Sequence, residues 1–95
     1  MVVGYGMLTL RLYDCHSLKE KRSVVKSFIG RIQSHFKMSV AEVGDNDIHQ
    51  KAQIGFALVG NDRRLINSIM DRILEMAHEF DAAEVVDSEM EIMTL

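Results

Sequence analysis

The stretch Ser17–Lys37, SLKEKRSVVKSFIGRIQSHFK, predicts one long amphipathic helix and holds most of the positive charge of the chain. Ser17 and Glu20 form a capping-box pattern, in which the hydroxyl accepts a backbone N–H of the first turn and the carboxylate reaches back to the cap. Apolar residues then recur at helical spacing, so one stripe of the helix must be buried against another layer. These residues are Leu18, Val25, Phe28, Ile29, Ile32 and Phe36.

Met1–Tyr13, which precedes this helix, alternates in the manner of a β-strand. Its two faces differ, because one side is rich in leucine and the other carries Tyr5 and Met7. Gly4 and Gly6 fall on the leucine side, where a helix can approach closely. The leucines are Leu8, Leu10 and Leu12.

Two further strands, Met38–Val43 and His49–Val59, follow the helix. Between them lies Gly44-Asp45-Asn46-Asp47, a cluster of residue types that favour turns, so the pair is predicted to form a hairpin. Alternation in the second of these strands predicts a buried apolar face. This face is formed by Ala52, Ile54, Phe56 and Leu58.

A second helix is predicted after Gly60, with Asn61 as its candidate N-cap and an end near Glu79. Ala82–Leu95 then predicts the last strand. Alternation assigns to its apolar face Val86, Met90 and Ile92. The same alternation assigns to its opposite face Val85, Asp87, Glu89, Glu91 and Met93.

The predicted order β-α-β-β-α-β is typical of the α+β ferredoxin-like fold, a two-layer sandwich. Right-handed crossovers would place both helices on one face of a four-stranded antiparallel sheet. The 95 residues contain no Pro and no evident linker, so we expect a single domain over residues 1–95.

The composition indicates in which cellular compartment the protein is expected. One cysteine cannot form an internal disulfide, and nothing in the chain indicates an oxidising environment. The apolar N-terminus lacks a basic lead-in, alternates like a strand and is interrupted by Arg11, which disfavours a signal peptide or a membrane span. We therefore expect a cytoplasmic protein that is not membrane-bound.

The net charge of −3 hides an asymmetry along the chain. Residues 11–37 carry a local charge of +5, whereas residues 38–95 carry −8. Such basic and acidic faces can neutralise each other in the fold or simply be solvated. Alternatively, the basic segment can steer the protein toward an anionic partner.

Two segments, SLKEKRSVVKSFIGRI and VAEVGDNDIHQKAQIGFALV, resemble the YlxP-like family of small uncharacterised bacterial proteins, and the similarity covers essentially the whole chain. The resemblance implies a ferredoxin-like domain without an established enzymatic activity. Members of the family are often encoded beside translation and ribosome-maturation genes, which implies a role near RNA or the ribosome. The family often has an aromatic residue, usually tryptophan, where this chain has His49.

Five cations of the first helix are candidates for binding RNA phosphates. Lys19, Arg22 and Lys26 share one flank of the helix, with Lys21 and Arg31 on other faces. Each neutralised phosphate would add affinity and salt dependence without reading the base sequence. The alternative is that these residues only solvate the helix or pair with the acidic last strand.

The sheet face opposite the helices is the second candidate surface. It lacks the aromatic residues that stack bases in RNA-recognition domains, and the acids of the last strand would repel a phosphate backbone. Its scattered apolar side chains instead suggest an interface between two copies, the alternative being a solvated sheet. The candidate interface residues are Tyr5, Met7, His49, Val85 and Met93.

Catalysis and metal binding are not favoured by the sequence. Asp14-Cys15-His16 has the residue types of a nucleophile site, but adjacent side chains in an extended loop point apart. The other histidines show no metal-ligand spacing, and no glycine-rich phosphate loop precedes a helix. We therefore expect no enzyme, no metal, no cofactor and no small-molecule substrate.

Overall fold

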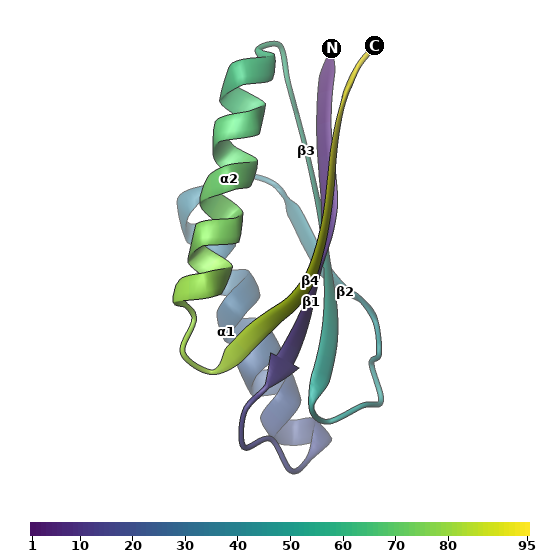
Figure 1. Ribbon diagram of the computed structural model, residues 1–95, viewed down its shortest axis with the longest axis vertical. Coiled ribbons are helices and arrows are strands. Elements are labelled where there is room, and N and C mark those ends of the chain that lie inside the picture. The colour runs from purple at the N-terminus through teal and green to yellow at the C-terminus, as the bar shows by residue number, and fades with distance from the viewer.

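A computed structural model of the chain describes all residues from 1 to 95 (Figure 1). Its element order confirms the predicted β-α-β-β-α-β pattern. The elements are β1 (Val2–Leu12), α1 (Leu18–His35), β2 (Ser39–Gly44), β3 (Lys51–Gly60), α2 (Arg63–Glu79) and β4 (Ala83–Thr94).

The four strands form one antiparallel sheet in the order β2-β3-β1-β4. Both helices lie on the same side of this sheet, and the other face is left open (Figure 1). The predicted ferredoxin-like architecture is therefore confirmed. Helix α1 lies along β2, whereas α2 packs over β1 and β4. The edge strands are thus β2, beside α1, and β4, beside α2.

The core lies between the helices and the sheet and contains the leucine face of β1 and the apolar face of β3. Phe28 of α1 and Phe80, the C-cap residue of α2, meet edge to face with ring centroids 5.2 Å apart. Gly4 is buried beneath α2, because a Cβ atom there would lie 2.6 Å from Ile66 Cγ2 and from Met70 Sδ. The predicted close approach of a helix to this glycine is confirmed.

The caps of the two helices differ in part from the prediction. Ser17 Oγ accepts the backbone N–H of Glu20 at 3.1 Å, as expected. The Glu20 carboxylate accepts the N–H of His16, one residue before the cap. Asn61 does not cap α2; that position is taken by Asp62, whose carboxylate accepts two backbone N–H groups of the first turn.

The predicted faces of β4 are wrong at its N-terminal end. The register with β1 shifts between Thr9 and Leu10, so Asp87 lies opposite Thr9 but Val85 lies opposite Leu10. Val86 is the extra residue of this bulge and is 51% exposed. A one-residue shift transfers the side chains on the N-terminal side of the bulge to the other face, and Val85 consequently packs against the core.

The third strand begins two residues later than predicted. His49 lies in the turn between β2 and β3 and is exposed, so it does not belong to the open face of the sheet. Neither helix is at once long enough and apolar enough to cross a membrane.

Candidate functional site

Three cations of α1 form what we call the basic strip, which consists of Lys19, Arg22 and Lys26. All three are exposed, and they follow one another at spacings of three and four residues, which places neighbours on one helix face. The strip extends over about 10 Å of helix axis, a length in which a nucleic acid duplex carries several phosphates. The predicted flank is therefore present as a continuous surface.

None of the five ion pairs of the chain involves the basic strip. The topology explains this, since α1 lies along β2 while the acidic strand β4 is the opposite edge of the sheet. Two of the β4 acids interact with β1 instead. Glu84 forms an ion pair with Arg11, and Glu91 accepts a hydrogen bond from the Tyr5 phenol. The last strand does not neutralise the strip.

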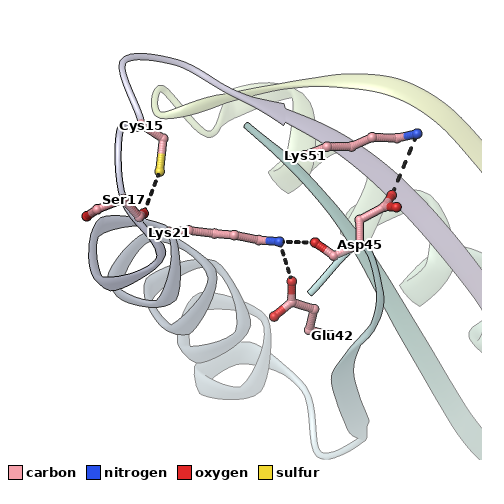
Figure 2. Close-up of polar contacts among 6 residues, drawn as sticks. All are labelled: Cys15, Ser17, Lys21, Glu42, Asp45 and Lys51. Atoms are coloured by element: carbon pink, nitrogen blue, oxygen red, sulfur yellow. Dashed lines mark hydrogen bonds and ion pairs between the residues drawn. The ribbon is translucent and has the colours of Figure 1, made fainter. Parts of the chain in front are cut away.

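Lys21, one of the five candidate cations, is buried and not exposed. Its side chain is 1% exposed, and its Nζ lies 2.9 Å from Glu42 Oε2 on β2 (Figure 2). The same ammonium group donates to the backbone carbonyl of Asp45. Lys21 is therefore bound within the protein and has no access to an external phosphate.

The Lys21 ion pair fixes the start of the loop between β2 and β3. Asp45 adopts a positive φ of 58°, a conformation that Asp tolerates, and its carbonyl accepts N–H groups from both Lys21 and Ile48. Its carboxylate lies 3.6 Å from Lys51 Nζ at the start of β3 (Figure 2). The two lysines hold the loop from opposite sides.

The sequence contained a signal for the burial of Lys21. It lies four residues before Val25 and seven before Phe28, so helical spacing places it on the buried stripe. A lysine in such a stripe needs a buried acceptor, and Glu42 on the adjacent edge strand is the residue that supplies it.

Arg31 lies away from the basic strip. Its guanidinium carbon is 5.5 Å from the ring centroid of Phe80, a cation–π geometry that holds the side chain near the C-terminal end of α2. Arg31 is exposed, but it is on a different face of α1 from Lys19 and Lys26.

Cys15 and His16 lie in different environments, because the first side chain is buried and the second is exposed. The Cys15 thiol is 2% exposed, and its Sγ donates to the carbonyl oxygen of Ser17 at 3.7 Å (Figure 2). His16 is exposed, and no hydrogen bond joins the two side chains. A shallow surface pocket of about 450 Å³ lies beside them, between the loop and the first turns of α1.

The open sheet face carries Tyr5, Met7 and Met93, as predicted, but neither Val85 nor His49. These three side chains lie on a shared surface because the strand register places them in neighbouring cross-strand pairs. A shallow, mostly apolar hollow of about 610 Å³ lies along β2, β3 and the middle of β1 and extends around the β2 edge to Gln33 of α1 and Met38. Gly55 and Ala57, which have little or no side chain, are among the residues that line it.

Tyr5 is expected to titrate abnormally on this face. The hydrogen bond that its phenol donates to Glu91 at 2.7 Å raises the pKa of Tyr5 above its usual value, because the tyrosinate would lose the bond and face a carboxylate. The resulting stabilisation is present below the ordinary tyrosine pKa and is lost as the pH rises through the raised one. We expect Glu91→Gln to lower the pKa of Tyr5, as measured by ultraviolet titration in a Tyr13→Phe background.

The control for this titration is Glu89→Gln, which removes a neighbouring acid that does not contact the phenol. Tyr5 should keep its raised pKa in this variant. An ordinary pKa for Tyr5 in the Tyr13→Phe variant that retains Glu91 would show that the hydrogen bond to Glu91 does not form in solution.

Comparison with known families and proteins identifies relatives of most of the chain. The model of a family described as "Protein of unknown function (DUF503)" matches residues 3–90. The uncharacterised protein YlxP of Bacillus subtilis (strain 168) is 32% identical over 83 residues, which cover 87% of this chain and 90% of YlxP.

Solved structures with the same fold share little sequence with the chain. The de novo designed protein Foldit4 aligns with a TM-score of 0.56 at 13% identity, over 100% of this chain and 99% of the other. SnoaB, a cofactor-independent oxygenase from Streptomyces nogalater, aligns with a TM-score of 0.51 at 12% identity, over 99% and 92%. At such identities the likeness concerns the fold alone.

Proposed function

This chain belongs to the DUF503 family of proteins of unknown function, and we propose that it binds the phosphate backbone of RNA, free or in the ribosome, through the basic strip. The observation that carries the proposal is that Lys19, Arg22 and Lys26 are exposed, adjacent and without an internal acidic partner. The proposed role is binding rather than catalysis, in a cytoplasmic protein.

The local arrangement matters because the whole protein is acidic. With a net charge of −3, unspecific attraction between the entire molecule and RNA is unfavourable. A contact must therefore be made by a surface on which positive charge is concentrated. The acids on β4, at the far edge of the sheet, would orient the protein so that the α1 side meets the RNA.

The chemistry of the strip predicts how RNA would be bound. Arg22 can engage a phosphate with two parallel N–H groups, whereas Lys19 and Lys26 act as point charges. None of these contacts reads a base edge, so affinity should depend strongly on salt and weakly on base sequence.

The test measures binding to a duplex RNA by fluorescence anisotropy at a series of salt concentrations. We expect the triple variant Lys19→Gln/Arg22→Gln/Lys26→Gln to bind more weakly than the wild type. Loss of three phosphate contacts should also flatten the slope of log K against log salt by about 2.7. Co-sedimentation with ribosomal subunits at low and high salt would show whether the RNA of the ribosome is bound in the same way.

The matched control is Arg63→Gln/Arg64→Gln/Arg72→Gln on α2, which removes the same number of positive charges from exposed or half-buried positions. It should leave the slope unchanged. An equal loss in both triple variants would assign binding to overall charge and not to the strip. A wild type that binds neither duplex nor ribosome at low salt would refute the proposal.

A further inference from the structure

We propose that the open face of the sheet binds a second copy of this chain, with a two-fold axis that runs along the strands between β1 and β3. This inference does not depend on RNA binding, because the basic strip lies on the helical side of the sheet. Aligned packing of two sheets, with strand directions within about 30° of each other, is a common arrangement of such faces.

The strand register arranges the open face in rows that run across the sheet. The terminal row consists of Val59, Val3 and Met93. The next row, which we call the tyrosine row, consists of Ser39, Ala57, Tyr5 and Glu91, in the order from β2 to β4. The row after it, the methionine row, consists of Ala41, Gly55, Met7 and Glu89.

The sizes of the side chains in the tyrosine row are complementary under the proposed axis. Such an axis exchanges β1 with β3 and leaves the position along the strands unchanged. Tyr5 of one copy would therefore lie over Ala57 of the other, and Met7 would meet the exposed Val43 side chain that covers Gly55. The large Tyr5 side chain would enter the apolar hollow where β3 presents Ala57, whereas the space over Gly55 is already occupied by the side chain of Val43.

The charges in the same rows are complementary as well. The proposed axis places Glu91 over Ser39 of the second copy, and Glu89 over Ala41, so that carboxylates meet uncharged residues of β2. An in-plane axis perpendicular to the strands would instead place β4 over β4. Acid would then face acid.

At the charged end of the face, the proposed axis places Arg11 of one copy over Lys51 of the other. Arg11 already pairs with Glu84, and Lys51 with Asp45, so these cations are compensated within each copy. The face measures about 36 Å along β1 and roughly 20 Å across four strands, which gives roughly 700 Å². Stable complexes bury about 600–1,000 Å² per partner, so the size of the face lies within this range.

The first test is sedimentation equilibrium of the full chain over a wide concentration range. We expect a monomer–dimer equilibrium, and we expect Ala57→Glu to abolish it by placing a carboxylate beneath Tyr5 of the second copy. Ala57 is exposed in the single chain, so this variant should fold normally. The control is Leu65→Glu, which makes the same change at a 57% exposed position on α2, away from the open face.

The second test identifies the axis by a charge exchange. Ala41→Asp should weaken the dimer by about tenfold, because each copy contributes one repulsive contact to Glu89 of the other. Glu89→Lys added to Ala41→Asp should restore the affinity. Within one chain, residues 41 and 89 lie on opposite edge strands about 14 Å apart, so the rescue can only act between copies.

Three results would overturn the inference. A protein that stays monomeric at all concentrations has no such interface. A dimer that survives Ala57→Glu uses another surface. A dimer that Glu89→Lys alone strengthens, without rescue of Ala41→Asp, has the axis perpendicular to the strands.

Discussion

Replacing Lys21 by methionine is expected to destabilise the protein by about 3 kcal/mol, one of the two largest effects that we predict for a single substitution. Methionine fills the space of the aliphatic chain but leaves the Glu42 carboxylate without its cation. The Glu42 side chain is only 17% exposed, so water can compensate the lost partner only in part. The free energy of unfolding, measured by urea denaturation, checks the expectation.

Two further variants make this experiment specific. Lys19→Met changes the same residue type two positions earlier on an exposed face, and should alter stability by about 0.5 kcal/mol or less. Lys21→Met/Glu42→Leu removes both charges and should recover most of the loss, because the cost arises from the unpaired carboxylate. If the double variant were as unstable as Lys21→Met, the contact to the Asp45 carbonyl would be the decisive one.

Lys21 also shows why the candidate site could be predicted only in part. The residue type indicates an exposed cation, whereas the helical position indicates burial, and the prediction followed the residue type. Its partner Glu42 is 21 residues away in the sequence. Only the fold shows that β2 lies beside α1 and offers a carboxylate there.

The faces of β1, α1 and β3 could be predicted well because each follows one unbroken period. A strand that alternates without interruption, or a helix with a regular stripe, has one orientation that buries its apolar residues. In β4 the bulge breaks the period, and both Val85 and Val86 are apolar, so composition does not reveal which of them points inward.

Whether the basic strip is free of internal acidic partners is decided by the topology of the fold and not by the composition of the chain. The sequence showed that the basic and acidic segments are separate, but not whether the fold brings them together. The strand order decides this, since β3 and β1 lie between β2 and the acidic strand β4. The same order creates the rows of the open face, in which large and small residues from distant segments become neighbours.

Gly6→Ala is expected to destabilise the protein by about 3 kcal/mol, at the upper end of what overpacking usually costs. A Cβ atom at Gly6 would lie 2.6 Å from the carbonyl oxygen of Glu89 and 2.7 Å from Phe56 Cζ. The first is a backbone atom of the paired strand β4, and the second belongs to a buried ring. Neither can move without disturbing the sheet or the core, and the melting temperature should fall by roughly 12 °C or more.

The matched control is Gly30→Ala in α1. Gly30 is exposed, and a Cβ atom there would have no neighbour within 4 Å. Alanine favours the helix over glycine by about 0.8–1.0 kcal/mol, so this variant should be more stable than the wild type. The same substitution therefore has opposite signs at the two glycines. If Gly6→Ala were tolerated as well as Gly30→Ala, β4 would not lie as close to β1 at this position as the structure places it.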